Sequence, residues 1–404
     1  MTALVGRAGL FAAAATLTLA CAHQPETAPL TPAVLTYFQD SYAESRAAFR
    51  ELAVELQRRH QGTEITVLGV PSEVERDLTI DLLYAPAAGP GRLLVLSSGV
   101  HGVEGFVGSA MQQLFLVEQI DSYLARGISV LLIHSVNPYG FSQLRRVSEN
   151  NVDLNRTFDT GDELFKTKNE GYVEVSGLLN PTSKVSMFGE DQVFLLKAIF
   201  NIALKGMANL RQAVLQGQYE EEHGLYFGGR SAEPQRHLLE PMLLERFAQH
   251  EKILMIDLHS GYGERGKLHL FPTQVADEER RADIERLFKG YRIDFGDSDD
   301  FYTVTGDFTG YVGKLMPESK LFVPMTFEFG TLDSQTTMGS IRSIHNMILE
   351  NQGFHHGYES EADRVEVKRR FREMYYPSSP RWRRAVVLQS QELFGVVAER
   401  FAAW

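Results

Sequence analysis

A histidine and a glutamate three residues apart are the first candidates for chemistry in this sequence. His101 and Glu104 lie in a glycine-rich segment, 97–105, that follows an apolar run. This spacing lets an imidazole and a carboxylate turn toward one ion, and the glycines remove steric bulk around it. His259 ends a different apolar run and could supply a second imidazole. Two histidines and one carboxylate are the protein ligands of a catalytic zinc that keeps one position open for water.

Glu328 ends a further apolar run and is the candidate acid and base. Zinc makes its water acidic near neutral pH, and a nearby carboxylate could take that proton and pass it to a leaving amine. Each of these residues also has a structural explanation. The His-x-x-Glu pattern is common, a buried histidine is usually structural, and a glutamate at the end of a strand is usually solvated. The prediction of a metal site therefore rests on a coincidence: three apolar runs, each a candidate strand, all end in residues of these types. The zinc helix signature His-Glu-x-x-His is absent.

The segment 145–156 is rich in groups that recognise anions. Its twelve residues contain three arginines, including Arg146 and Arg156, and four asparagines or aspartates. Arginines bind carboxylates in forked pairs, and an asparagine such as Asn155 can donate beside them. The segment is therefore either a substrate-recognition loop or a surface loop held together by ion pairs.

Short apolar, β-branched runs alternate with helical patterns along the chain, which predicts an α/β fold with a sheet under one core. Because ligands of open α/β sheets bind beyond the carboxyl ends of the strands, the polar residues at those ends should meet at one edge. We expect one catalytic domain over 33–404, with an insertion at about 160–235. The predicted strands are Leu78–Tyr84, Leu93–Leu96, Ile128–Ile133, Ile253–Leu258, Leu268–Phe271 and Leu321–Phe327, and the predicted helices are 33–60, 106–126, 189–215, 236–250, 277–289 and 380–403.

Dinucleotide-binding enzymes and serine hydrolases are disfavoured because the sequence lacks the complete motif of either class. The segment Gly261–Gly266 matches Gly-x-Gly-x-x-Gly, but a strand-like run, and not a helix, follows it. A dinucleotide site needs a helix to begin there, so none is predicted. The chain also lacks the Gly-x-Ser-x-Gly elbow of serine hydrolases.

Composition narrows the class of protein further. The 404 residues carry 52 acidic and 40 basic side chains, for a net charge of −12, which argues against nucleic-acid partners. With 44% hydrophobic and 23% charged residues, the chain has the composition of an ordinary globular protein. A single cysteine excludes an intrachain disulfide and a cysteine metal cluster, so a metal would need His, Asp and Glu.

The first 32 residues are predicted to be an export signal and a polar linker. Arg7 precedes the uncharged run Ala8–Ala20, which fits a secretory signal and is too short to span a bilayer as an ordinary helix. Thr18-Leu-Ala-Cys21 resembles a bacterial lipobox, although Thr18 differs from the usual leucine. We expect residues 1–21 to direct export to the periplasm or to membrane anchoring through lipidated Cys21, with 22–32 as linker. The alternative is a plain signal in which Cys21 is incidental.

Over about 90–330, the candidate site residues and the segments around them resemble the zinc metallocarboxypeptidase superfamily. The matching elements, in chain order, are His101-x-x-Glu104, Asn137-Pro-x-Gly140, Arg146 through Val152-Asp-Leu-Asn-Arg156, His259 and Glu328. Gly217-Gln-Tyr219 and Gly224–Gly229 resemble a bacterial branch carried as a domain of unknown function.

The resemblance implies a mixed, mostly eight-stranded sheet and one zinc ion held by His101, Glu104 and His259. It further implies that Asp153 orients His101, Arg146 polarises the scissile carbonyl, Asn155 and Arg156 hold the terminal carboxylate of the substrate, and Glu328 is the general base. The tyrosine that closes over substrate in this superfamily has no motif here, and Tyr302 and Tyr311 are the candidates.

The predicted function is zinc-dependent hydrolysis of peptide or other amide bonds. The first alternative is an N-acyl amino acid amidohydrolase similar to the aspartoacylase-like relatives. The second is a noncatalytic exported binding protein, but such a protein would have no need of Glu328. The partner in either enzymatic case is a peptide or an N-acyl amino acid.

Overall fold

The computed structural model describes residues 35–89, 91–188, 190–273, 278–295, 304–317 and 320–404. The predicted signal segment, the linker and Tyr302 lie outside these residues. Among the helices of the described part, none combines the length and apolarity that crossing a bilayer requires.

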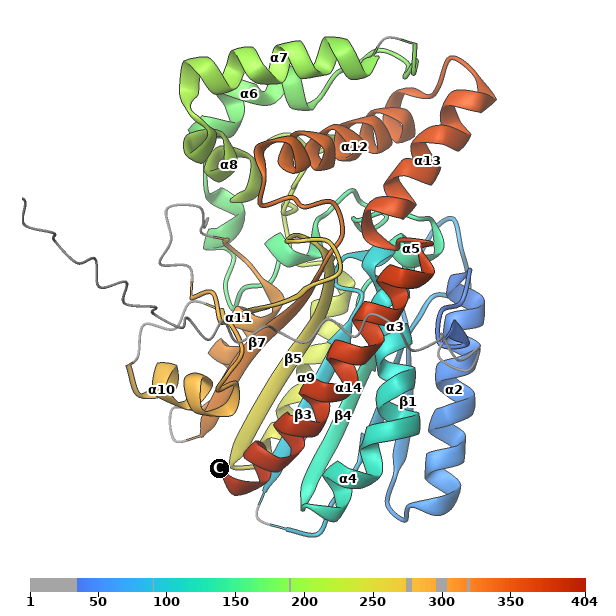
Figure 1. Ribbon diagram of the computed structural model, residues 1–404, viewed down its shortest axis with the longest axis vertical. Helices are drawn as coiled ribbons and strands as arrows, with labels where there is room; N and C mark the ends of the chain where they lie inside the picture. Colours follow the sequence, from blue (N-terminus) through green and yellow to red (C-terminus); the bar gives the residue numbers. More distant parts are fainter. Residues whose placement is uncertain (1–34, 90, 189, 274–277, 296–303, 318–319) are drawn as a thin grey trace, which may run out of the picture.

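A mixed sheet of seven strands lies at the centre of the described chain (Figure 1). Its spatial order is β1-β2-β4-β3-β5-β7-β6. The central strands β4, β3, β5 and β7 run parallel, whereas β1, β2 and β6 pair antiparallel at the two sides. The strands are β1 (Glu64–Gly69), β2 (Thr79–Ala85), β3 (Arg92–Ser98), β4 (Ile128–His134), β5 (Lys252–Gly261), β6 (Leu268–Phe271) and β7 (Leu321–Gly330).

All six predicted strands are present, and the α/β class is confirmed. The described residues form seven strands and not the eight that the resemblance implied. The strand absent from the prediction is β1, an edge strand with no fully buried residue, so it carries no apolar run to reveal it. In contrast, β2 to β5 are buried almost throughout, because helices cover both faces of the sheet.

Helices lie on both sides of the sheet. Figure 1 shows α3, α4 and α14 in front of the strands and α9 behind them, and α2 packs against α3 and the first two strands. The α-helices are α2 (Tyr42–Arg59), α3 (Gly105–Leu114), α4 (Ile120–Ala125), α5 (Pro138–Ser142), α6 (Glu170–Leu179), α7 (Glu190–Lys205), α8 (Met207–Leu215), α9 (Pro234–Ala248), α10 (Glu278–Leu287), α11 (Phe308–Leu315), α12 (Thr337–His356), α13 (Glu361–Tyr375) and α14 (Pro380–Ala403).

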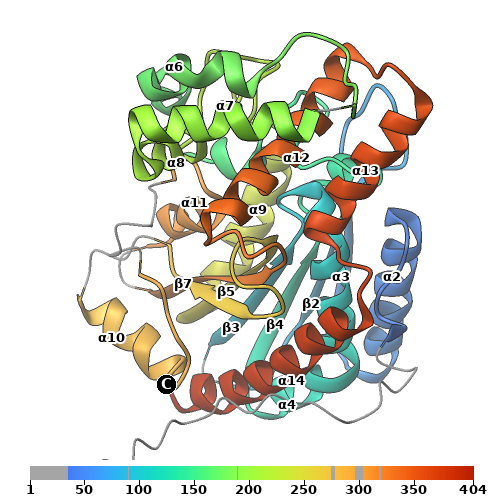
Figure 2. The ribbon, with the colours of Figure 1, turned by 45° about the horizontal axis from the view of Figure 1, so that its top comes forward.

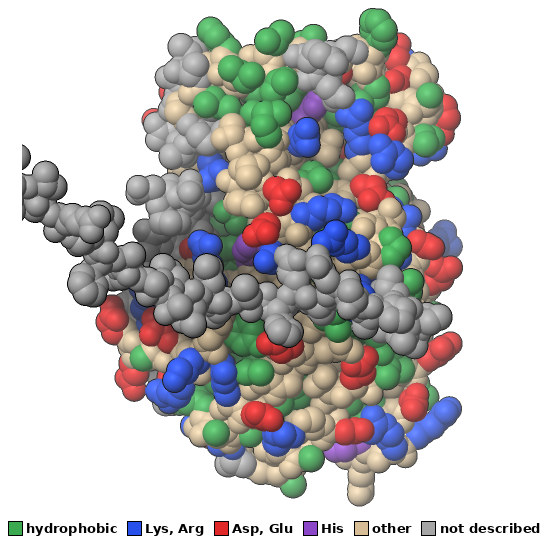
Figure 3. Space-filling view, viewed as in Figure 1, with side chains coloured by type: hydrophobic (Ala, Val, Ile, Leu, Met, Phe, Trp, Pro, Cys, Tyr) green, Lys and Arg blue, Asp and Glu red, His purple; other side chains and the backbone are tan. Residues whose placement is uncertain are grey.

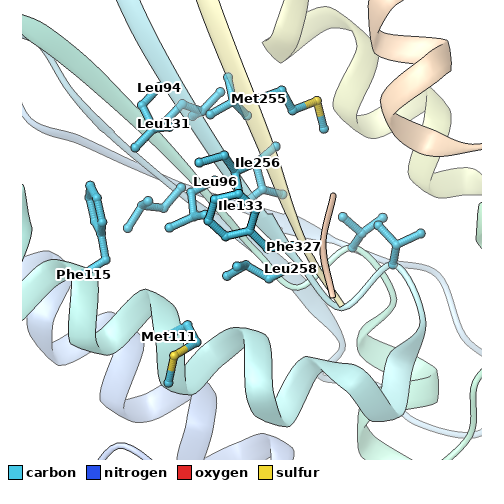
Figure 4. Close-up of a cluster of buried hydrophobic side chains, with 14 of the residues drawn as sticks. Leu94, Leu96, Met111, Phe115, Leu131, Ile133, Met255, Ile256, Leu258 and Phe327 are labelled. Carbon is cyan, nitrogen blue, oxygen red and sulfur yellow. The ribbon is translucent and has the colours of Figure 1, made fainter. Parts of the chain in front are cut away.

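The main core occupies both faces of the sheet, and one large part of it lies between the sheet and α3. Figure 4 shows side chains of β3, β4 and β5, among them Leu96, Ile133 and Ile256, together with Met111 of α3 and Phe115, which follows it. These side chains are fully buried. The core therefore fixes the central parallel strands, and with them the positions of the residues at their carboxyl ends.

A helical lobe made of α6, α7, α8, α12 and α13 covers the carboxyl ends of the parallel strands (Figures 1 and 2). It has an apolar cluster of its own, to which all five helices contribute. The predicted helix 189–215 is two helices, because Gly206 adopts φ +79° between α7 and α8. The outer face of α7 is also apolar, with Leu196 and Phe200 largely exposed, and Figure 3 shows hydrophobic side chains on the top surface, where Figure 1 draws this helix.

Candidate metal centre

The loop that follows β3 carries the first two candidate ligands. His101 precedes a short 3-10 helix, Gly102–Glu104, that leads directly into α3. A Cβ atom at Gly102 would lie 2.2 Å from the carbonyl carbon of Gly140 in α5, so only glycine allows this approach. The close packing against α5 fixes both side chains at the carboxyl end of β3.

The third ligand and the candidate base come from two paired strands. His259 of β5 stands opposite Glu328 of β7 in the parallel register. Because β5 also pairs with β3, the strand pairing alone brings all four candidates to one edge of the sheet.

The three candidate ligands form a compact, buried cluster. The ligand atoms of His101, Glu104 and His259 all lie within 4.8 Å of one another. The two oxygens of Glu104 lie 2.9 Å from Nδ1 of His101 and 2.9 Å from Nδ1 of His259. Both imidazoles thus present Nδ1 to the centre of the cluster.

A second carboxylate fixes each imidazole from its far side. His101 Nε2 lies 3.1 Å from Asp153 Oδ1, and His259 Nε2 lies 2.7 Å from Asp257 Oδ2. A carboxylate behind a histidine holds the ring, favours the tautomer with Nδ1 free to bind metal and increases its basicity. The donor set and its supports therefore fit a divalent metal ion bound by two histidines and one glutamate.

The charges of the cluster also favour a bound metal ion. Burial opposes ionisation of Glu104, but the two imidazoles hold its pKa below the ordinary range. Burial likewise opposes the charge of His259, yet Asp257, by charge and hydrogen bond, and Glu104 raise its pKa well above the usual value. The buried carboxylates therefore favour positive charge at the position that a metal ion would occupy.

Glu328 lies beside the cluster, and it lines the cavity. Its Oε1 accepts a hydrogen bond of 2.9 Å from the backbone N–H of Tyr262. Burial and the negative charge of Glu104 raise its pKa to about 8, against the opposing effects of His259, the Tyr262 N–H and Arg146. This carboxyl group therefore exchanges its proton close to neutral pH.

Arg146 joins the cluster to the loop behind it. Its Nε donates to Asp153 Oδ2 at 2.9 Å, and its Nη1 lies 3.4 Å from Glu104 Oε1. Although burial opposes it, the Asp153 carboxylate raises the pKa of Arg146 well above the ordinary value. The guanidinium lines the cavity and is permanently charged there.

Asn155 and Arg156 also line the cavity, but their contacts are mostly with the main chain. Arg156 donates through Nε and Nη2 to the carbonyl of Leu215 in α8, and through Nη1 to the carbonyl of Asn155. Asn155 Oδ1 accepts from the N–H of Phe308 at the start of α11. These bonds hold the Arg156 charge in place at the cavity wall.

The structure does not place Tyr311 in the cavity, which corrects its assignment as a substrate-binding residue. Its ring is 1% exposed and packs on Phe158, and its hydroxyl bonds to Glu240. Three other tyrosines, Tyr226, Tyr262 and Tyr375, do line the cavity. Tyr375 places its hydroxyl 3.5 Å from Arg146 Nη1, and the ring of Tyr226 lies 5.3 Å from Cζ of Arg146 and 5.6 Å from Cζ of Arg156.

The sequence prediction missed Asp257, the cavity tyrosines and the lobe helices α6, α12 and α13, although it placed a helix over α7 and α8. Asp257 had a readable signal, because it is the only charged residue in the apolar run Ile253–Leu258 and lies two residues before His259. Residues two apart on a strand share a face. Tyr375 follows a charged helical segment, and nothing in its neighbourhood indicates a site.

The cavity above the cluster has a volume of about 320 Å³. Its floor is formed by polar residues at the strand ends, and its remaining walls come largely from the helical lobe. His101, Glu104, His259, Arg146 and Glu328 all face it. A cavity of this size with a few convergent polar groups is typical of a small-molecule or substrate site.

Sequence comparison assigns a family to this arrangement. The family model described as "Protein of unknown function (DUF2817)" matches residues 38–389. The chain belongs to the DUF2817 family. This assignment agrees with the domain of unknown function that the glycine-rich segments indicated. No curated protein matches the sequence.

Solved structures similar to this DUF2817 protein include several carboxypeptidases. Carboxypeptidase A from Helicoverpa armigera is 16% identical, with 83% of this chain and 73% of that chain covered and a TM-score of 0.40. Bovine thrombin-activatable fibrinolysis inhibitor, solved with tick carboxypeptidase inhibitor, is 13% identical, with coverage of 78% and 97% and a TM-score of 0.43. A metallo-carboxypeptidase from Burkholderia cenocepacia is 11% identical, with coverage of 79% and 70% and a TM-score of 0.41. Similarity at this level leaves the activity of the chain to be argued from its own residues.

Proposed function

We propose that this DUF2817 protein is a zinc-dependent amide hydrolase that acts as a carboxypeptidase. One observation carries the proposal: the cluster of His101, Glu104 and His259, whose ligand atoms lie within 4.8 Å of one another, faces a cavity that also contains Glu328 and Arg146. A binding protein would have no need of Glu328, a partly buried carboxyl group whose pKa is raised to about 8.

The cluster suits zinc by its ligand types. Two imidazoles and one carboxylate, with a position left for water or substrate, are typical of zinc hydrolases. When bound, zinc would lower the pKa of a water molecule and polarise the amide carbonyl. Asp153 and Asp257 would keep both imidazoles in the tautomer and orientation that binding requires.

Glu328 would move the protons of the reaction. As a carboxylate it takes one proton from the attacking water, while the water oxygen adds to the carbonyl carbon of the amide. The C–N bond then breaks and the proton held by Glu328 passes to the leaving nitrogen, which gives one carboxylic acid and one amine. A raised pKa suits both steps, because the group can bind and release a proton near neutral pH.

The two arginines would have different roles, one in stabilising the transition state and the other in binding the substrate. Arg146 lies beside Glu104 and would stabilise the negative charge that forms on the carbonyl oxygen. Arg156 and Asn155 would bind the terminal carboxylate of the substrate, a role that a forked guanidinium performs better than an ammonium group.

The proposal is tested by measuring metal content and hydrolysis together. Purified protein without residues 1–32 should contain about one zinc per chain and should cleave members of a panel of peptides and N-acyl amino acids. His259→Ala should abolish both zinc binding and cleavage, whereas His356→Ala, at an exposed position on α12, should preserve both.

Three outcomes would overturn the proposal in whole or in part. Full zinc occupancy in the His259→Ala protein would refute the ligand assignment. A zinc-loaded protein that turns over neither class of compound would support the binding-protein alternative. Cleavage of N-acyl amino acids alone would favour the amidohydrolase alternative and exclude the peptidase.

A further inference from the structure

We propose that the helical lobe forms an apolar chamber above the metal centre, and that the substrate carries a bulky apolar group that fills it. The inference rests on the proposed function for the bond that is cleaved, and it adds the chemical class of the group beside that bond.

The chamber walls come from four helices of the lobe. Its apolar lining includes Leu178 and Leu179 of α6, Phe194 of α7, Leu215 of α8, and Ile344 and Met347 of α12. The same residues belong to the apolar cluster of the lobe or pack against it. The cluster is therefore open on the side that faces the metal ligands.

Contacts between the lobe helices hold these walls in place. Phe194 stacks on His345 of α12 with ring centroids 4.1 Å apart and an interplanar angle of 3°. The hydroxyl of Tyr375 lies 2.9 Å from Sδ of Met347, which joins the end of α13 to α12. The chamber is thus preformed, which favours binding because little ordering has to follow.

Polar side chains on this wall have partners within the protein. Asn201 donates to the carbonyl of Lys197 at 2.9 Å, one turn back on α7. Arg211 Nη2 lies 3.5 Å from Ser340 Oγ. Apart from the charged Arg211, the lobe side of the cavity is therefore mostly apolar, while Arg146 and Arg156 supply positive charge at the floor.

This division calls for an amphiphilic substrate. A carboxylate and an amide would meet the arginines and the metal centre, and a bulky apolar group would leave water for the chamber. The whole cavity of about 320 Å³ is many times larger than the space that one water-sized group needs. A medium-length acyl chain or a large apolar side chain fits this space, and a small polar group would leave it unfilled.

The acyl chain and the side chain are two sources of one chemistry, and a substrate series separates them. One arm compares the N-acetyl, N-octanoyl and N-dodecanoyl derivatives of one amino acid. The other compares peptides with glycine or leucine next to the scissile bond. Since each buried methylene is worth about fourfold in affinity, kcat/KM should rise at least tenfold from the smallest to the largest apolar group in at least one arm.

Variants of the chamber test its location. Leu178→Trp fills the chamber and Ile344→Asp puts a charge into it, and each should remove most of the preference for the larger group. The matched control is Leu196→Asp, which places the same charge on the exposed outer face of α7 and should leave the preference unchanged. Circular dichroism identifies any variant that fails to fold.

Binding of dodecanoate and of acetate, measured by calorimetry, gives a readout that does not need turnover. Dodecanoate should bind the wild-type protein much more tightly than acetate, and Leu178→Trp should weaken dodecanoate at least tenfold. Hydrolysis without a size preference, together with equal binding of the two acids, would overturn the chamber while the proposed function stands. Selective dodecanoate binding without any hydrolysis would support the chamber and overturn the proposed function.

Discussion

Replacing Asp257 by asparagine tests whether the buried cluster is built for a metal ion. In the wild-type protein one oxygen of Asp257 accepts from Ser97 at 2.6 Å and the other contacts His259 Nε2 at 2.7 Å. Asparagine keeps the shape, and with its oxygen toward His259 it can donate its amide to the Ser97 hydroxyl. The change therefore removes the charge behind the imidazole and little else.

The expected loss follows from that single difference. A hydrogen bond to a charged group contributes about 1.5–3 kcal/mol, and one between neutral groups contributes about 0.5–1.5 kcal/mol. The difference of roughly 1–1.5 kcal/mol corresponds to about tenfold weaker zinc binding, at the lower end of what loss of such outer carboxylates causes. Asp257→Ala also frees the ring and should weaken zinc binding further, toward 100-fold.

Competition with a chromogenic chelator measures zinc affinity directly, without a substrate. The control is Asp81→Asn, which removes an equally buried carboxylate from β2 at its ion pair with Arg50, away from the cluster. Asp81→Asn should leave zinc affinity within twofold of wild type. If Asp257→Asn also stays within twofold, the carboxylate does not support a metal ligand and the reasoning on the cluster fails.

Glu328→Gln should lower turnover by roughly two or more orders of magnitude while zinc content stays at the wild-type level, and near-normal turnover would assign the base elsewhere. In the metal-free protein, the pKa of Glu328 rises from 4.5 on unfolded chain to about 8 on folding, so wild-type stability should fall as pH increases between these values. Denaturant titrations should therefore show the metal-free Gln variant more stable than wild type by about 1–3 kcal/mol at pH 8.5 and equally stable at pH 4, and equal stability at both would contradict the burial of this carboxylate. Steady-state kinetics should show that Arg146→Ala chiefly lowers kcat and Arg156→Ala chiefly raises KM, with C-terminal amidation of the substrate reproducing the Arg156 loss; equal cleavage of amidated and free peptides would exclude an exopeptidase. The mature protein should begin at or near residue 21 outside the cytoplasm, and Cys21→Ser should release it from membranes if that cysteine is acylated; mass spectrometry that finds residues 1–20 on a cytosolic protein would refute export.

The sequence predicted that His101, Glu104 and His259 would lie together because they come at or just beyond the ends of apolar runs. Runs such as Leu93–Leu96 are apolar at consecutive positions, so their limits and the polar residues beyond them are visible without a structure. Strand pairing then brings His259 and Glu328 opposite each other. Short-range pattern and the geometry of parallel sheets were enough for this part of the site.

The lobe could not be predicted in the same way. Helix α12 buries Glu350, Asn351 and Gln352 as well as apolar residues, because it packs against several neighbours and not against one face. Its sequence therefore lacks the single apolar stripe that marks an amphipathic helix. The position of Tyr375 at the cavity depends on the tertiary packing of α13, which no local pattern encodes.

Tyr311 shows a limit of assigning roles by residue type. A tyrosine near the expected site was a reasonable candidate for closing over substrate, yet its hydroxyl bonds to Glu240 and its ring is buried in the main core. Buried tyrosines usually find a partner for their hydroxyl, and that partner decides which way the ring points. Only the packing of α11 settles this direction.

The cavity draws its reactive floor and its apolar walls from different parts of the chain. The floor consists of strand ends and the loop around Arg146, whereas the walls come mainly from α6 to α8 and from α12 and α13. The selectivity of the protein can therefore be altered separately from its reactivity. A combinatorial library restricted to wall positions in these helices should change which compounds are accepted and leave zinc affinity intact.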